Sequence, residues 1–445
     1  IAEHLDDRFR LLTGGSRSAL PRQQTLRATI DWSYQLLEEP ERVCLRRLSV
    51  FAGSFTLEAA EAVCAGEGIE SYELLDLVAG LVLRSLVLAE RDGGQARYRL
   101  LETIHENAAE RLVESGETAT LRGRHREFFL ALAESAPTWS GAGEEVWLER
   151  MEADHDNLRA ALQSGGYEDR ADEAHLRLAA AAWRFWEVHA YRSEGRGWLE
   201  PAVAASAEAP APLRAKLLMG AGAIIGWLSD FEESLAYQER SLALYRQLGD
   251  TAGVGLSLSY LGIRAGYLGE YREATKLFEE SLAYSRASGD KALIACQLAD
   301  LANLACLEGD LARGLLSRGL VACRQGHDEQ AAALQREALE LAREVGDRGC
   351  IAWCLAGLGT LAAAAGQPER AVRLLAAAEL LRDSIGGPLH PIDQREYESV
   401  AAAVRAELGA ERFASVRAEG QAMALEQAVA YALEQQTHDR SATQS

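Results

Sequence analysis

One stretch of the 445-residue chain gathers residue types that bind metal ions. Asp154, His155, Asp156 and Asn157 follow one another directly and lead into an amphipathic run that starts at Leu158. Carboxylate and imidazole groups are common metal ligands, but adjacent side chains point in different directions and do not converge on one ion. Asp and Asn ahead of such a run are typical of a helix start. The sequence therefore predicts a helix here and no metal site.

The motifs that catalysis or nucleotide binding would need are missing from the sequence. It contains no Gly-x-x-x-x-Gly-Lys-Ser/Thr phosphate loop, and the stretch over residues 14–17 (GGSR) lacks both the lysine and a preceding strand. Neither Gly-x-Ser-x-Gly nor His-Glu-x-x-His occurs. Glu102 and His105 lie three residues apart on one predicted helical face, which is the usual spacing of a solvated pair. We expect no catalytic residues, no metal and no cofactor in this chain.

Charge and composition narrow the class of protein. The chain has 46 Lys and Arg against 67 Asp and Glu, a net charge of −21, so it repels polyanions, and no basic patch interrupts this field. No apolar run reaches the roughly 18 residues that a membrane span needs. The seven cysteines are dispersed and none forms a Cys-x-x-Cys pair. They indicate reduced core residues of a cytoplasmic protein, not a disulfide framework or a zinc site.

The first hundred residues predict a small domain of helices and one hairpin. Apolar residues recur at helical spacing in residues 25–37, 40–51, 56–64 and 71–83. A strand (85–90), a tight turn, a second strand (96–101) and a helix from Thr103 follow. Helices followed by a two-stranded wing make a winged helix, which we assign to residues 21–118. This domain holds 10 basic and 17 acidic residues, so we do not expect it to bind DNA.

Beyond residue 121 the chain is alanine-rich, predicted helical and repetitive. Turn signals at 229, 269, 309, 326 and 366 lie 40, 40, 17 and 40 residues apart, which suggests five units, one of them shortened. Small residues stand seven positions before each turn (Gly222, Gly262, Ala302, Gly319, Gly359) and five after it (Ser234, Ala274, Gly314, Ala331, Ala371). Such positions let two helices approach closely. The pattern resembles the tetratricopeptide repeat in a 40-residue form, which implies a right-handed α-solenoid over residues 208–387.

The resemblance to tetratricopeptide repeats also implies a binding groove, because the first helix of each pair lines the concave face of such a solenoid. The repeat alignment places ten residues near it: Met219, Trp227, Ser259, Tyr260, Ile263, Tyr267, Asp300, Asn303, Trp353 and Thr360. Aromatic and apolar groups with a few polar ones suit an extended peptide or an apolar ligand. Alternatively, some of them, Trp227 especially, pack between repeats. For Tyr260, Tyr267 and Asn303 the sequence does not separate these two roles.

Further helices are predicted on both sides of the repeats. Residues 119–207 are expected to form a helical connector and an irregular leading helix pair. Residues 388–434 are expected to form capping helices, and the polar residues 435–445 a disordered tail. The chain is therefore expected to be mostly α, with a small winged helix followed by a solenoid.

Five stretches carry a wider family resemblance: residues 10–17 (RLLTGGSR), 20–34 (LPRQQTLRATIDWSY), 41–53 (ERVCLRRLSVFAG), 97–104 (RYRLLETI) and 155–162 (HDNLRAAL). With the repeats, the chain resembles bacterial signal-transduction ATPases of the STAND class, including ATP-dependent LuxR-type and AfsR-like transcriptional regulators. The resemblance implies an NB-ARC-type ATPase before the winged helix, with residues 1–20 as the linker from it, and a repeat array that senses an inducer or partner. ATP or ADP is then expected only in that upstream domain.

Two departures from the family limit what it implies. Leu100, Leu101 and Glu102 stand where many NB-ARC proteins have Met-His-Asp, and no LuxR-type helix pair follows Glu434. Our first hypothesis is a non-catalytic sensor arm that binds a protein, peptide or small inducer and acts on an ATPase domain of the same protein. One alternative is a free-standing peptide receptor or scaffold. A further alternative is a DNA-binding regulator that acts through the wing. We expect no partnership with nucleic acid or membrane.

Overall fold

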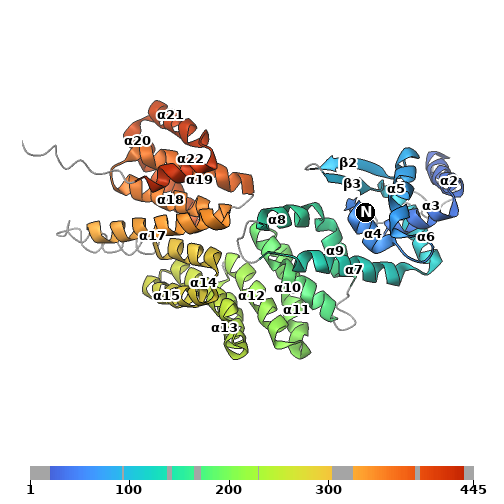
Figure 1. Cartoon of the computed structure of the whole chain (residues 1–445), viewed down its shortest axis with the longest axis horizontal. Coiled ribbons are helices and arrows are strands. Elements are labelled where there is room, and N and C mark those ends of the chain that lie inside the picture. The colour runs from blue at the N-terminus through green and yellow to red at the C-terminus, as the bar shows by residue number, and fades with distance from the viewer. Residues whose placement is uncertain are drawn as a thin grey trace, which may run out of the picture. The chain divides into compact units, whose positions relative to one another are not determined.

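The computed structural model describes residues 21–92, 95–137, 143–164, 172–228, 230–302, 324–385 and 391–434 (Figure 1). The chain divides into two compact units. The first comprises Ile1–Ser135 and Leu148–Ala181, and the second comprises Ala136–Trp147 and Ala182–Ser445. Both are built mainly from helices, and none of the helices in the described ranges is long and apolar enough to cross a membrane.

The first unit has the element order of a winged helix, as the sequence predicts. Its helices are α2 (Pro21–Gln35), α3 (Glu39–Leu48), α4 (Leu57–Cys64), the short η2 (Ser71–Glu73), α5 (Leu74–Leu83) and α6 (Glu102–Ser115). The wing is the antiparallel pair β2 (Leu88–Asp92) and β3 (Gln95–Arg99). A two-residue strand that the sequence did not reveal, β1 (Phe55–Thr56), pairs with β3 and gives the sheet order β1-β3-β2. Thr56 then caps α4 by accepting a 3.1 Å hydrogen bond from the Ala59 amide.

The first unit extends past the predicted boundary at residue 118, because later helices complete its core. These helices are α7 (Thr118–Glu134) and α9 (His155–Gln163), and α8 (Glu144–Ala153) precedes α9. Phe51 stacks on Phe55 with ring centroids 4.6 Å apart, and Phe129 of α7 meets Phe51 edge-on at 6.5 Å. Asn157 of α9 is fully buried and accepts a 2.9 Å hydrogen bond from the Ala52 amide. Part of the predicted connector therefore belongs to the core of the first unit.

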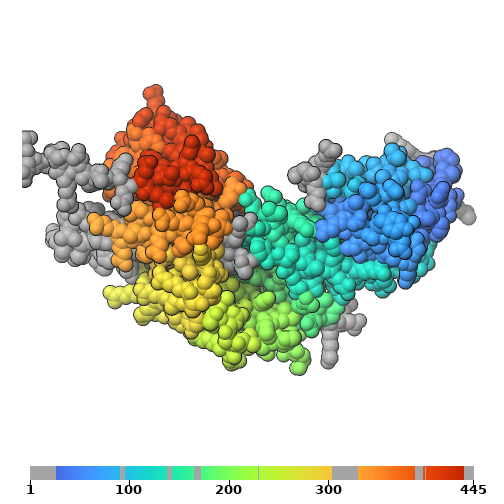
Figure 2. Space-filling model, viewed as in Figure 1, coloured from blue at the N-terminus to red at the C-terminus, as the bar shows by residue number. Residues whose placement is uncertain are grey.

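The second unit is a series of antiparallel helix pairs. It contains α10 (Glu173–Val188, from residue 182), α11 (Arg192–Ala205), η3 (Ser206–Glu208), α12 (Ala211–Trp227), α13 (Phe231–Leu248), α14 (Thr251–Tyr267), α15 (Tyr271–Ser288), helical residues 291–302, α17 (Arg324–Val345), α18 (Arg348–Ala364) and α19 (Pro368–Ile385). We call α10, α12, α14, the helix over 291–302 and α18 the first helices. The capping helices are α20 (Pro391–Leu408), α21 (Ala410–Gln421) and α22 (Leu425–Leu433). Of these, α21 packs on α19, and α22 packs on both α18 and α19 (red in Figure 2).

A Gly-Asp pair separates successive repeats and explains why the helices stop and restart there. Gly249 and Gly289 adopt the left-handed conformation, with φ of 68° and 73°, which ends α13 and α15. Asp250 then accepts a 2.9 Å hydrogen bond from the Gly253 amide and caps α14. The sequence signal at the ends of the repeats is thus a C-cap followed directly by an N-cap.

The predicted close approach within helix pairs is confirmed in three of them. A Cβ atom built on Gly222 would lie 2.7 Å from Gln238 Cγ of the facing helix. Equivalent contacts would be 2.9 Å from Gly262 to Phe278 and 2.9 Å from Gly359 to Leu375. The second helices contribute Ser234, Ala274 and Ala371, all with no exposed surface. Glycine is therefore required on the first helices because larger residues of the second helices fill the space.

One predicted turn is wrong. α17 is helical from Arg324, so it runs through residues 326–328, where a turn was expected. A buried stripe of Ala331, Gln335, Ala338 and Ala342 continues along this helix, and a single glycine costs a helix only about 1 kcal/mol. The predicted turns at 229 and 309, the small residues Gly314 and Gly319, the linker over 1–20 and the tail over 435–445 lie outside the described residues.

Candidate binding site on the first helices

A buried carboxylate joins three successive first helices. Glu187 of α10 is 5% exposed, and its Oε1 accepts hydrogen bonds from Tyr260 Oη of α14 at 2.7 Å and from Trp227 Nε1 of α12 at 2.9 Å. Its Oε2 lies 2.6 Å from Arg184 Nη1, one turn earlier on α10. Burial raises the pKa of Tyr260 well above its usual value, and Glu187 adds to this, so the phenol stays a donor. The three helices are fixed to one another at this point.

Two arginines complete this polar cluster. Burial acts to lower the pKa of Arg184, but the carboxylates of Glu144 and Glu187 raise it well above its ordinary value. The Arg192 guanidinium, at the start of α11, lies 4.2 Å from the centre of the Trp227 ring, a cation–π distance. The desolvation cost of burying such charges is repaid only in part by their partners, but removing one partner would leave the other charge buried and unpaired at a high cost. The cluster therefore acts mainly as a positioning element for the first helices.

The acidic start of α8 is held by two first helices that are far apart in the sequence. Glu144 Oε1 accepts a 2.9 Å hydrogen bond from Arg184 Nε of α10. Glu145 Oε1 lies 2.5 Å from Arg348 Nη1 of α18, 203 residues later. Both pairs lie within the second unit. The first helices thus already bind one acidic segment of the chain itself.

The structure separates the ten predicted groove residues into two groups and leaves one outside. Met219, Ser259 and Tyr260 are 1%, 5% and 7% exposed, which favours the alternative that these side chains pack between repeats. They pack between repeats, where Ser257 contacts the Met219 sulfur and Tyr260 binds Glu187. Asn303 lies outside the described residues. The half-buried remainder, which we call the first-helix surface, is Trp227, Ile263, Tyr267, Asp300, Trp353 and Thr360.

The first-helix surface offers mixed apolar and polar contacts. Tyr267 lies against Phe231 with ring centroids 6.4 Å apart, while Thr360 donates a 3.2 Å hydrogen bond to Ala356 of its own helix. The indole N–H of Trp353 is buried and meets no hydrogen-bond acceptor among the described residues. This N–H faces inward, so a ligand on the first-helix surface would contact the exposed part of the Trp353 ring instead.

The sequence did not identify the charged members of the site. Arg184 and Glu187 interrupt an apolar run of α10 that includes Trp183 and Trp186, and this interruption is the signal that could have found them. Charged side chains inside an apolar stripe become buried, so other helices have to supply hydrogen-bond or ion-pair partners for them. Glu144 and Glu145 carry no such local signal.

In the first unit, residues 154–157, which include potential metal ligands, have a structural role. Asp154 is buried and forms a 2.5 Å ion pair with Arg97 of the wing, while Asn157 donates a 2.8 Å hydrogen bond to the Ser54 carbonyl. The predicted helix start at this stretch is confirmed, but Asp154 makes no capping hydrogen bond. His105 lies 3.0 Å from the Phe51 carbonyl, so its prediction as part of a solvated pair with Glu102 is wrong.

A cavity of about 320 Å³ lies beside His105 in the first unit. His125 and polar side chains of α7 and α9 line it, among them Thr118, Arg122 and Gln163. Burial lowers the pKa of His125 to about 4, against an opposite effect of Asn157, so this imidazole is neutral at pH 7. This cavity could not be predicted from the sequence, because its walls come from the segment after α3 and from α6, α7 and the end of α9.

Comparison with known proteins agrees with the repeat architecture. The family described as tetratricopeptide repeat matches residues 213–287 and 310–379. The chain contains tetratricopeptide repeats. It is 35% identical over 356 residues to the Mycobacterium tuberculosis protein named "Putative HTH-type transcriptional regulator Rv0890c", which covers 78% of this chain and 38% of that protein. It is 46% identical over 128 residues to "Uncharacterized protein Rv0894" of the same species, covering 28% and 33%. The chain thus spans less than two fifths of these relatives.

Two solved structures are distantly similar to this tetratricopeptide-repeat protein. One is a Signal Transduction ATPase with Numerous Domains (STAND) protein with a tetratricopeptide repeat sensor from Pyrococcus horikoshii, at 15% identity and a TM-score of 0.37, covering 88% of this chain and 64% of that one. The other is BtubC from P. vanneervenii, at 13% identity and a TM-score of 0.34, covering 59% and 93%.

Proposed function

We propose that this chain is the non-catalytic sensor arm of a STAND-type signal-transduction ATPase or transcriptional regulator. The first-helix surface binds a protein, peptide or small inducer, and the winged helix transmits this to an ATPase domain of the same protein. The observation that carries the proposal is the similarity over 78% of the chain to a protein named as a transcriptional regulator, of which the chain spans only 38%. The repeats supply the binding function, since they occur widely as interaction modules.

The surface of the first unit supports a role as a docking domain. Large apolar side chains are exposed on and just after α2, at η2 and α5, and before α6: Trp32, Leu36, Tyr72, Leu75, Leu83 and Leu101. Exposed apolar groups in such number suit a covering protein surface. By contrast, Arg97 of the wing is 5% exposed and paired with Asp154, and Arg84 is paired with Glu41. Arg97 is therefore too buried to neutralise a DNA phosphate, and Arg84, although half-exposed, is already paired with a carboxylate.

The acidic start of α8 occupies two arginines of the first helices, and a binding partner would have to compete with it or bind beside it. Glu144 and Glu145 occupy Arg184 and Arg348, so an acidic partner would compete with α8, whereas an apolar one would bind beside it. The half-exposed pair of Glu145 and Arg348 is the weaker contact, because solvent screens it. We infer that partner binding loosens this end of α8 first.

The coding sequence upstream of residue 1 tests the proposal directly. A phosphate loop within about 300 residues, roughly two domains, is the expected result. A start codon immediately before Ile1 would overturn the sensor-arm proposal and favour the free-standing receptor.

A further inference from the structure

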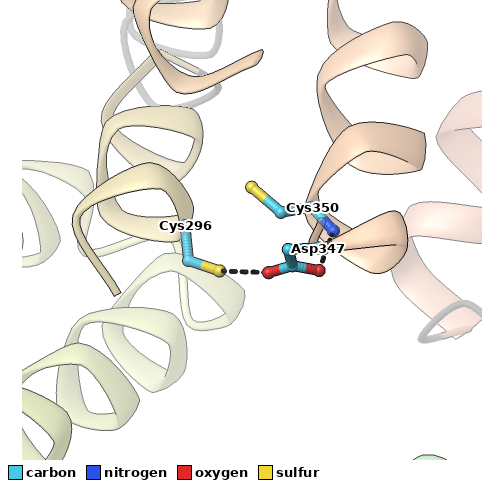
Figure 3. A group of neighbouring side chains, drawn as sticks. All are labelled: Cys296, Asp347 and Cys350. Carbon is cyan, nitrogen blue, oxygen red and sulfur yellow. Dashed lines mark hydrogen bonds between the residues drawn. The ribbon is translucent and has the colours of Figure 1, made fainter. Parts of the chain in front are cut away.

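Three potential metal ligands from two repeats meet at one junction of the second unit. Cys296 lies in the helix over residues 291–302, and Asp347 and Cys350 begin α18 (Figure 3). Their ligand atoms all lie within 4.8 Å of one another. Cys296 Sγ is 3.8 Å from Asp347 Oδ2, although 51 residues separate the two in the sequence. A search for closely spaced cysteines could not find this cluster.

The spacing of these atoms is close to that of a zinc site. Zn–S bonds of about 2.3 Å and Zn–O bonds of about 2.0–2.2 Å in a tetrahedron put sulfur and oxygen about 3.6 Å apart and two sulfurs about 3.8 Å apart. The observed 3.8 Å between Cys296 Sγ and Asp347 Oδ2 needs only a small side-chain adjustment. Cys354 lies one turn after Cys350, is fully buried and interacts with the Cys350 thiol, but its sulfur is not one of the three ligand atoms that lie within 4.8 Å of one another.

The chemistry of the three side chains suits Zn²⁺. Two thiols and one carboxylate are ligand types that Zn²⁺ binds in proteins, and a bound divalent ion would hold the thiols as thiolates. Cys350 is buried and Cys296 is partly buried, so the ligand atoms are largely shielded from water.

A second repeat junction shows that packing alone does not require these groups. Asp347 Oδ1 caps α18 by accepting a 2.8 Å hydrogen bond from the Cys350 amide, just as Asp290 accepts from the Leu293 amide at 3.0 Å. Counted from the capping Asp, Leu293 matches Cys350. One 40-residue period before Cys296 stands Leu256. Leucines thus occupy at one junction the positions that carry thiols at the other, while the second oxygen of Asp347 is turned toward Cys296 (Figure 3).

We propose that Cys296, Asp347 and Cys350 form a Zn²⁺ site that joins the helix over 291–302 to the start of α18. Binding forms two Zn–S bonds and one Zn–O bond and releases the two thiol protons to solvent, with no change of oxidation state. A water fills the fourth position. The site makes the relative position of two repeats depend on a metal ion, and it does not rest on the proposed sensor function.

Cobalt titration of the reduced, metal-free full chain tests the site. We expect one equivalent of Co²⁺ to give a thiolate-to-cobalt charge-transfer band, which Zn²⁺ abolishes by displacement. Cys296→Ser and Cys350→Ser should each lose the band, and Asp347→Asn, which keeps the cap, should weaken binding about 10-fold or more. Cys44→Ser and Cys64→Ser, buried thiols of the first unit, serve as matched controls and should keep the band.

Two further arms keep the test decisive. The double variant Cys306→Ser/Cys323→Ser removes the two cysteines outside the described residues and should retain the band. Circular dichroism checks that each variant is folded, and release of two protons per Co²⁺ bound is measured on the unaltered chain. The proposal is overturned if the folded wild type shows no band, if either Cys296→Ser or Cys350→Ser keeps it, or if the double variant abolishes it.

Discussion

Tyr260 donates a 2.7 Å hydrogen bond to Glu187, a residue 73 positions earlier in the chain. This bond spans from α14 to α10, and Trp227 of α12 donates to the same oxygen. One buried carboxylate therefore sets the position of three first helices. Tyr260 is a residue of repeat packing, and ligand binding is left to the half-buried positions around it.

Tyr260→Phe should lower the stability of the second unit by roughly 1.5–3 kcal/mol, because it removes a buried hydrogen bond to a charged acceptor. Tyr237→Phe on α13 is the matched control, since this half-buried tyrosine lies on a second helix. Urea unfolding followed by circular dichroism measures both. Equal stability of the two variants would show that the Glu187 cluster does not hold the first helices together.

Ala274→Leu should cost roughly 1–3 kcal/mol, because Ala274 has no exposed surface and a larger side chain overpacks the contact between α14 and α15. Ala283→Leu in the same helix adds the same atoms at an exposed position and should change little. Because repeats contact mainly their neighbours, hydrogen exchange should increase in α14 and α15 before it does in the first unit. Faster exchange in the first unit alone would contradict the repeat register.

The first unit should lose stability as the pH falls from 6.5 to 4. His125 binds a proton at about pH 6.5 when unfolded but only at about pH 4 when folded, so the unfolded chain takes up a proton in this range and the folded chain does not. The effect is absent well above pH 6.5 and reaches about 3 kcal/mol below pH 4. Between pH 7 and 5, the wild type should lose about 2 kcal/mol more than His125→Gln, measured by urea unfolding. If both proteins lose the same free energy of unfolding, titratable groups other than His125 cause the acid sensitivity.

The chain should not shift DNA in a mobility assay at physiological ionic strength. Arg97 is already paired with Asp154, and the chain has a net charge of −21. Binding would therefore release few of the counterions that surround the DNA phosphates. Salt-sensitive binding by the wild type that Arg84→Ala abolishes would revive the DNA-binding alternative.

Local signals in the sequence predicted the local structure well. Gly249 followed by Asp250 marked a repeat boundary, because a left-handed C-cap and an N-cap each need a particular residue type. Gly262 and Ala274 marked a close contact between α14 and α15, because only small residues fit where two helices approach this closely. The winged-helix order also followed from spacing, whereas the two-residue β1 is too short to leave a pattern.

Long-range partners were not predictable in this way. Glu187 meets Tyr260 across 73 residues and Cys296 meets Asp347 across 51, and no periodicity connects either pair. Helical spacing placed Tyr260 on the first helix correctly, but its burial depends on a carboxylate from the irregular leading pair. Exposure, and therefore groove membership, is decided by such partners and not by the repeat alone.

The central claim, that these repeats regulate a nucleotide-hydrolysing segment of the same gene product, is tested most directly by ATP hydrolysis. The rate is measured for the complete gene product, for this chain alone, and for the complete product with Tyr267→Ala/Trp353→Ala or with the control Tyr237→Ala. We predict hydrolysis by the complete product, none by the chain, and a rate altered about 5-fold or more by the double variant only. No hydrolysis by the complete product, or equal rates in both variants, would contradict the account.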